Sequence, residues 1–170
     1  MEITETANQY LTFTLDKEQY AVDVAKVREV LEVPDLTKIP RMPDYMIGVI
    51  NIRGHVVPVI DLRTKFGMER IEHTVRTSIV VTEIASQGDL ITIGCLADSV
   101  QEVVDITSDQ IEDPPKIGTT VDTDFIAGVG KKDDRFIIIL DVDRVFRDAE
   151  LSAVAGSVQK KAGTEQPAGV

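Results

Sequence analysis

The stretch that decides the fold covers residues 43–66 and reads PDYMIGVINIRGHVVPVIDLRTKF. Two apolar, β-branched runs, 45–52 and 56–62, stand on either side of Arg53-Gly54. This pattern predicts a β-hairpin, because glycine readily supplies the positive φ that a tight turn requires. An asparagine, Asn51, and an arginine, Arg53, lie at the tip of a hairpin whose first strand carries no charge.

Two further residues of this stretch predict local features. Pro58 cannot donate a hydrogen bond to a neighbouring strand, so it marks a sheet edge or a bulge. Asp61 is placed to cap a short helix over 63–65, because aspartate is a favoured N-cap residue.

The same pattern returns later in the chain. Residues 44–49, DYMIGV, resemble 124–129, DFIAGV, 80 residues further on, and 57–62 resemble 137–142 at the same spacing. Residues 27–33 resemble 100–106 at a spacing of 73. Chance similarity among Val/Ile-rich strands is the alternative, but aspartate and glycine also fall in register. The spacing therefore predicts an internal duplication, with one strand-rich unit in each half.

Short apolar segments between turn signals predict a mostly β protein. Two five-stranded lobes of about 70 residues each would be marginal alone, so they should share an apolar layer. We expect the ordered domain to cover 9–147, with flexible tails at 1–8 and 152–170. Strands are expected at 9–15, 20–24, 29–33, 77–84, 90–97, 125–130 and 136–140, and residues 98–105 should repeat the region around Val27. A helical turn is expected near 25–26, and a helix from Asp141 whose apolar stripe is Val142, Val145, Phe146 and Leu151.

Composition excludes several classes of protein. The 18 basic and 29 acidic residues give a net charge of -11, which disfavours nucleic acid and anionic membrane surfaces as partners. No run approaches the roughly 20 apolar residues of a membrane span. The start, MEITETANQ, is not a secretory signal, and with a single cysteine the chain has no internal disulfide. We expect a cytoplasmic protein.

Residues suited to catalysis are scarce. His55 and His73 show no ligand-like spacing to Cys95, so we expect no metal site, and Cys95 in ITIGCLA reads as a buried, inert thiol. Neither a phosphate-binding GxxxxGK[ST] motif nor a G-x-S-x-G motif occurs. Asp61 and Asp141 are equivalent in the duplication, which favours two helix caps over an acid-base pair. We expect neither an enzyme nor a cofactor.

Binding is the remaining class of function. Arg53 is either a surface turn residue or the partner of Glu29, with which it would form a bidentate pair. The second copy has Lys131-Lys132-Asp133-Asp134 at the turn, so the turn itself does not require arginine. The apolar side chains around Glu29 cannot all face one core, and some should line a cleft for another protein: Val27, Val30, Leu31 and Val33.

Five motifs along the chain form one recognisable pattern. They are QYLTFTL, EQYAVDVAKVREV, P-x-x-x-x-GVINIRG-x-VVPVIDLR-x-KF, ITIGCLADSVQEV and D-x-x-F-I-x-GVG. Taken together, they resemble the CheW family of bacterial chemotaxis coupling proteins, which also occurs as the regulatory domain of the histidine kinase CheA and in CheV. The resemblance covers 9–146. The absence of a kinase core or receiver domain favours a stand-alone coupling protein.

The resemblance implies two SH3-like five-stranded β-barrels with a shared core, and no enzymatic activity. It implies an adaptor that joins the CheA regulatory domain to the cytoplasmic signalling tips of chemoreceptors (methyl-accepting chemotaxis proteins), at membrane-associated arrays but without membrane insertion. An adaptor of another chemosensory pathway, controlling motility appendages or gene expression, is the alternative. By resemblance, the receptor-binding groove between the barrels contains Val27, Glu29, Gly48, Asn51, Arg53, Gly54 and Val100.

Overall fold

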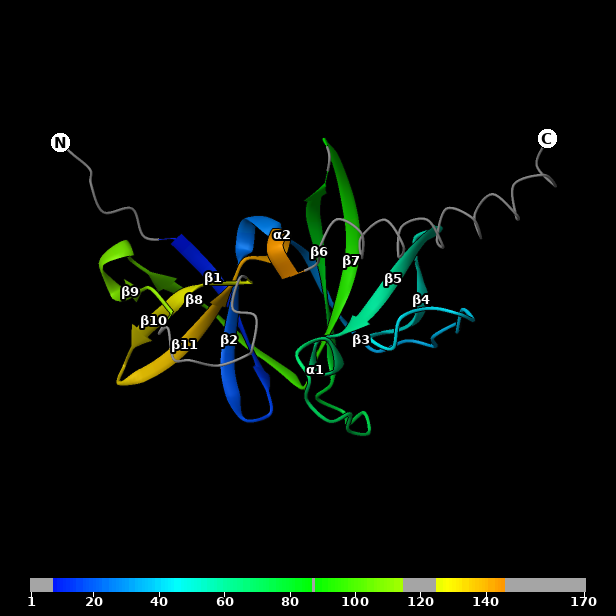
Figure 1. Ribbon diagram of the computed structural model, residues 1–170, viewed down its shortest axis with the longest axis horizontal. Coiled ribbons are helices and arrows are strands. Elements are labelled where there is room, and N and C mark those ends of the chain that lie inside the picture. The colour runs from blue at the N-terminus through cyan, green and yellow to red at the C-terminus, as the bar shows by residue number, and fades with distance from the viewer. Residues whose placement is uncertain (1–7, 87, 115–124, 146–170) are drawn as a thin grey trace.

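The computed structural model describes residues 8–86, 88–114 and 125–145, which form two curled β-sheets with only short helical turns between them (Figure 1). The elements are β1 Asn8–Leu15, β2 Glu18–Asp23, η1 Val24–Lys26, β3 Val27–Glu32, β4 Met46–Ile52, β5 His55–Asp61, α1 Leu62–Lys65, β6 Ser78–Ser86, β7 Asp89–Ala97, β8 Ser99–Ile106, η2 Ser108–Gln110, β9 Ile111–Glu112, β10 Ile126–Lys132, β11 Arg135–Leu140 and α2 Val142–Val145.

We call the five-stranded sheet lobe 1 and the six-stranded sheet lobe 2. Lobe 1 has the strand order β3-β6-β7-β5-β4, and lobe 2 has the order β8-β1-β2-β11-β10-β9. Each sheet curls around an apolar cluster of its own. In lobe 1 the buried residues are Ile50, Val57, Val59, Ile79, Val81 and Leu96. In lobe 2 they are Tyr10, Ala21, Ile106, Ile137 and Ile139.

A third and larger apolar layer lies between the lobes. It includes Phe13 of lobe 2 and Ile60 and Ile84 of lobe 1, each at most 1% exposed. The rings of Phe66 and Phe125 stack across it with their centroids 4.4 Å apart. The mostly β fold with a shared core is therefore confirmed, and the two lobes cannot separate without exposing the largest cluster of the described residues.

The duplication is built by exchange of strands between the halves. Lobe 1 contains β3, β4 and β5 from the first half and the β6–β7 hairpin from the second. Lobe 2 contains β8, β10 and β11 from the second half and the β1–β2 hairpin from the first. The parallel ladders agree residue by residue, since Val59 pairs with Gly94 and the equivalent Ile139 pairs with Ala21.

The two lobes differ from the predicted equal strand number by one short strand. In lobe 2, β9 pairs Glu112 with Val129 of β10, whereas in lobe 1 a single residue, Thr37, bridges to Val49 of β4. The equivalent glycines Gly48 and Gly128 admit these segments. A Cβ on Gly48 would lie 2.8 Å from the Thr37 carbonyl oxygen, and one on Gly128 would lie 2.6 Å from Ile111 Cγ2. The sixth strand is therefore a longer version of a contact that both lobes make.

Pro58 does not mark a sheet edge, because β5 has β4 on one side and β7 on the other. Its ladder with β7 begins only at Val59, the residue after the proline. Pro58, which has no N–H, therefore lies just before the point where β7 begins to pair with β5, so no hydrogen bond to β7 is lost there. The register shift of this hairpin lies elsewhere, between Met46 and Gly48.

Both predicted helix caps are present. Asp61 Oδ1 accepts a hydrogen bond from the backbone N–H of Arg63 at 3.0 Å, and Asp141 Oδ1 accepts one from Asp143 at 3.1 Å. The turn near 25–26 is the 3-10 helix η1. In the predicted C-terminal helix, Val142 and Val145 are buried in α2, while Phe146 and Leu151 lie outside the described residues. So do the predicted tails, except Asn8, which pairs with Ile106 in β1.

Candidate functional site

The tip of the β4–β5 hairpin is a turn with two consecutive positive φ angles, 48° at Arg53 and 88° at Gly54. The Asn51 side chain closes it, because its Oδ1 accepts the Gly54 N–H at 2.8 Å. The equivalent turn of lobe 2 has φ values of 51° at Asp133 and 62° at Asp134. Aspartate tolerates this conformation better than arginine, for which it costs about 1 kcal/mol. The backbone of the turn therefore does not explain why arginine stands at position 53.

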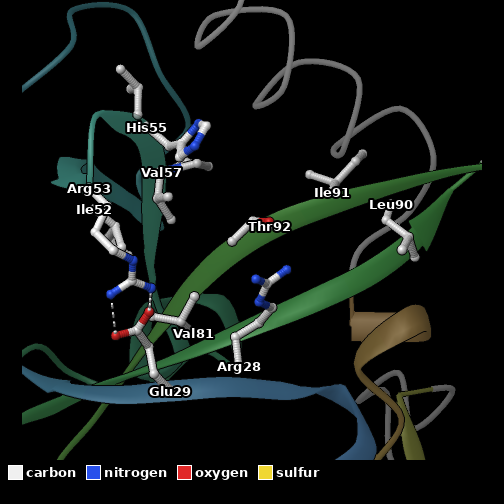
Figure 2. A pocket seen from close by; sticks show the side chains of 12 residues that line it. Arg28, Glu29, Ile52, Arg53, His55, Val57, Val81, Leu90, Ile91 and Thr92 are labelled. Carbon is white, nitrogen blue, oxygen red and sulfur yellow. Dashed lines mark hydrogen bonds and ion pairs between the residues drawn. The ribbon is translucent and has the colours of Figure 1, made fainter.

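The Arg53 side chain reaches across to β3 and forks onto both carboxylate oxygens of Glu29 (Figure 2). The Nη1–Oε1 distance is 3.5 Å, and Nη2 bonds Oε2 more closely. The hydrogen bond that Arg53 donates to Glu29, and then the negative charge of Glu29, raise the pKa of Arg53. The arginine side chain is 72% exposed, so the pair contributes little to stability and serves mainly to fix where a charged fork stands.

This ion pair forms one rim of an open groove of about 630 Å³ in lobe 1. β3 supplies one wall and β7 another, while the β4–β5 hairpin closes the far side (Figure 2). Val81 is 2% exposed and belongs to the floor. Arg28 stands beside Glu29 and pairs with Glu83 at 2.7 Å. The groove is lined by Arg28, Glu29, Ile52, Arg53, His55, Val56, Val57, Pro58, Val81, Leu90, Ile91 and Thr92.

The residues predicted for one receptor groove occupy three places. Glu29 and Arg53 line the groove of lobe 1, and Asn51 and Gly54 build the turn that presents Arg53. Gly48 lies in β4 against the loop at Thr37. Val27 and Val100, equivalent residues of the duplication, both lie half-buried against the shared core between the lobes.

The structure adds residues that the sequence did not single out. Leu90 is 66% exposed, although it is large and apolar, and with Ile91 and Thr92 it forms the β7 wall of the groove. These residues belong to the second half of the chain, whereas the other walls belong to the first. Only the exchange of hairpins between the lobes brings them together, and a comparison of the two halves contains no signal for that exchange.

The described residues offer little for catalysis. Burial raises the pKa of Cys95 to about 11, and the hydrogen bond to Thr82 offsets only part of this effect. The thiol is therefore protonated and shielded at neutral pH. Within residues 8–86, 88–114 and 125–145, no group of three or more His, Cys, Asp or Glu side chains could hold a metal ion. None of the helices in those segments is long and apolar enough to span a bilayer.

Comparison with known proteins gives consistent relatives along nearly the whole chain. The chain is 32% identical over 151 residues to "Chemotaxis protein CheW" of Klebsiella aerogenes, covering 88% of this chain and 89% of that protein. It is 30% identical to the protein of the same name from Bacillus subtilis, covering 88% and 94%. It is 32% identical to that from Thermotoga maritima, covering 82% and 88%.

A solved structure agrees with the fold described above. The scaffolding protein TtCheW from Thermoanaerobacter tengcongensis superimposes with a TM-score of 0.76 at 36% identity, covering 85% of this chain and 96% of the other. Residues 9–150 match the family described as "CheW-like domain". With the two-lobed β fold, the duplicated hairpins and the Asn51–Gly54 turn in place, the chain belongs to the CheW-like domain family.

Proposed function

We propose that this protein is a non-enzymatic adaptor of bacterial chemotaxis, which couples the signalling tips of chemoreceptors to the histidine kinase CheA in the cytoplasm, at membrane-associated arrays. Relatives over most of the chain carry the name of a chemotaxis protein, and a structural relative is titled a scaffolding protein. The coupling function itself requires two partner surfaces, and the structure offers the open groove of lobe 1 and the half-buried valines Val27 and Val100 beside the shared core.

At the residue level, the proposal assigns Glu29, Arg53, Val27 and Val100 to contacts with a receptor helix. The chemistry of these positions fits an amphipathic helix, because half-buried valines can meet its apolar face and an exposed charged fork can fix its register. The kinase regulatory domain would then use another face of the protein.

One observation carries the residue-level proposal. Arg53 occupies a left-handed backbone position, where the equivalent residue of lobe 2 is an aspartate. Its side chain forms an exposed ion pair with Glu29. Neither choice stabilises the fold appreciably. A strained residue that the fold does not need indicates a requirement of binding.

The test is substitution of Arg53 by asparagine, which suits the turn but lacks the charge. Binding of the variant to a soluble receptor-tip fragment and to the CheA regulatory domain is measured separately by calorimetry, followed by kinase activity in the reconstituted mixture. We expect Arg53→Asn to weaken receptor-fragment binding by about tenfold, the loss of about 1.4 kcal/mol. Kinase activation in the mixture should fall in parallel.

The matched control is Asp133→Asn, which also replaces a charged residue by asparagine, at the equivalent turn of lobe 2. Its binding should match that of the unsubstituted protein. If Arg53→Asn binds the receptor fragment normally and loses affinity only for the kinase domain, the groove belongs to the kinase, and the receptor assignment fails. If the unsubstituted protein binds neither fragment, the adaptor function itself fails.

A further inference from the structure

The chain passes between the two lobes twice within the described strands, and an ion-pair network stands at each crossing. The first crossing runs from β2 through η1 to β3, and the second runs from β7 through Asp98 to β8. Val27 begins the strand after the first crossing, and Val100 lies two residues beyond Asp98. Whatever holds the crossings therefore acts close to these two valines, each of which is also paired within the sheet of its own lobe.

The second crossing is held by what we call the Arg63 clamp, formed by Arg63, Asp98 and Asp16. Arg63 Nε and Nη2 donate to the two carboxylate oxygens of Asp98, each at 2.8 Å, and Arg63 Nη1 donates to the Glu69 carbonyl oxygen at 2.8 Å. Asp98 also accepts the Asp16 N–H at 2.9 Å. Arg63 belongs to α1 of lobe 1 and Asp16 to the β1–β2 turn of lobe 2, so the clamp ties the lobes together.

The first crossing is held by what we call the Lys26 clamp, formed by Lys26, Asp143 and the backbone of Ala85. Lys26 Nζ lies 2.9 Å from Asp143 Oδ2, and the other oxygen, Oδ1, accepts the Ala85 N–H at 2.9 Å. Asp143 thereby joins α2 of lobe 2 to β6 of lobe 1.

The two clamps are related by the duplication, with the charges reversed. Arg63 and Asp143 are equivalent, since each is the second residue of the short helix that follows the second hairpin strand. Lys26 lies one position beyond Ala25, which is the equivalent of Asp98. In one clamp the helix gives the cation and the crossing gives the anion, and in the other the roles are exchanged. Chance ion pairs on a surface would not be expected to repeat in this way.

The clamps differ in strength. The side chains of Arg63 and Asp98 are 10% and 19% exposed, and their contact is bidentate. The side chains of Lys26 and Asp143 are 35% and 31% exposed and share one contact. The Lys26 clamp is therefore the one that can be broken without endangering the fold.

We propose that the two clamps fix the angle between the lobes and thereby hold Val27 and Val100 at the spacing that a receptor helix requires. Lys26, Arg63, Asp98 and Asp143 are then positioning residues that act through the valines. This inference rests on the proposed function, and it assigns to the two clamps the role of holding Val27 and Val100 in place for the receptor helix.

The test uses Lys26→Asp, Asp143→Lys and the double variant that carries both changes. Affinity for a soluble receptor-tip fragment is measured by calorimetry. Lobe separation is measured by pulsed electron spin resonance between labels on Glu32→Cys and Asp105→Cys, equivalent exposed positions of β3 and β8. The buried Cys95 thiol does not compete for the label.

We expect each single change to weaken binding about threefold or more and to broaden the label distance distribution. The double variant restores the ion pair in reverse, but lysine at position 143 cannot accept the Ala85 N–H, so it should recover part of both quantities relative to Asp143→Lys. Lys38→Asp, an equal charge change on the exposed β3–β4 connection of lobe 1, should leave both unchanged.

Unchanged affinity in both single variants overturns the inference, whatever the label distance shows. A double variant that recovers nothing relative to Asp143→Lys also overturns it, because the effect would then belong to the individual residues. If the unsubstituted protein does not bind the receptor fragment, the proposed function fails. In that case an unchanged label distance in the single variants would show separately that the clamp does not set the angle between the lobes.

Discussion

Arg63 and Asp98 form a nearly buried bidentate ion pair, with two N–O distances of 2.8 Å, at a point where the chain passes from one lobe to the other. Burial opposes ionisation of Asp98, but hydrogen bonds from Arg63 and from the Asp16 N–H outweigh it and lower the pKa of the carboxyl. The pair is thus ionised in the folded protein over the whole neutral range.

The first prediction concerns the pH dependence of stability. Because the folded-state pKa of Asp98 is depressed, its stabilising contribution is fully present above the unfolded pKa of about 3.9 and is lost as pH falls through the lower folded value. Asp98→Asn should lower the free energy of unfolding by about 3 kcal/mol at pH 7, and the difference should shrink below pH 4. Urea unfolding at several pH values measures this. A difference that stays constant down to pH 2 would show that Asp98 acts through shape alone.

The second prediction separates a structural from a binding role for Gly48. A methyl group there meets the Thr37 carbonyl oxygen at 2.8 Å on a backbone with φ of 153°. Gly48→Ala should therefore cost about 2–3 kcal/mol in the free energy of unfolding, and so should Gly128→Ala, where the methyl meets Ile111. Thermal and urea unfolding check both.

Gly88→Ala is the control for these glycines. Gly88 has a φ of 85° but open space around a Cβ, so the change should cost only the backbone strain of about 1 kcal/mol. Equal losses at all three positions would mean that close approach to the neighbouring segment does not matter. In that case the predicted contact of Gly48 with a receptor would remain the simpler reason for glycine.

Much of the fold follows from local sequence, and the duplication is the reason. The aspartate caps, the hairpin turns and the glycines in register each depend on a few neighbouring residues. Asp61 and Asp141, for example, occupy equivalent positions and cap their helices in the same way. The placement of Pro58 was predicted wrongly in part, because whether a strand is flanked on both sides depends on how β7 arrives from the other half. A proline in the sequence indicates that one backbone hydrogen bond is missing, but it does not indicate which strands lie on either side.

The site was predictable only where its parts are close in sequence or repeated. The contrast between Arg53 and Asp133 indicated that the turn does not require arginine, and of the two alternatives then left open for Arg53 the structure has the pair with Glu29. Leu90 and the β7 wall could not be found, because they reach the groove only through the exchange of hairpins. The Lys26–Asp143 pair is hidden for a related reason. Its charges are reversed relative to Arg63–Asp98, so a search for identical residues in the two halves passes over it.

The third prediction concerns Cys95. Its pKa is raised to about 11 by burial, so the reactive thiolate is almost absent at pH 8 and the sulfur is shielded from solvent. A thiol-specific reagent should label native protein very slowly, at a rate set by opening of the shared core, and label urea-unfolded protein at once. Rapid labelling of native protein would contradict the burial. Asp98→Asn should speed labelling, because it loosens the contact between the lobes.

The last prediction tests whether the duplication extends to side-chain positions. Glu102 of β8 is the equivalent of Glu29, and Asp133 is the equivalent of Arg53, and both line a smaller groove of about 260 Å³ in lobe 2. Asp133→Arg should therefore place a guanidinium within reach of Glu102 and recreate the pair of lobe 1. The turn itself should lose about 1 kcal/mol, because arginine fits a left-handed position less well than aspartate. A double-mutant cycle with Glu102→Gln isolates the pair, and we expect a coupling of about 0.5 kcal/mol that fades in high salt. A coupling indistinguishable from zero at low salt would mean that the backbones of the two lobes correspond but their groove walls do not.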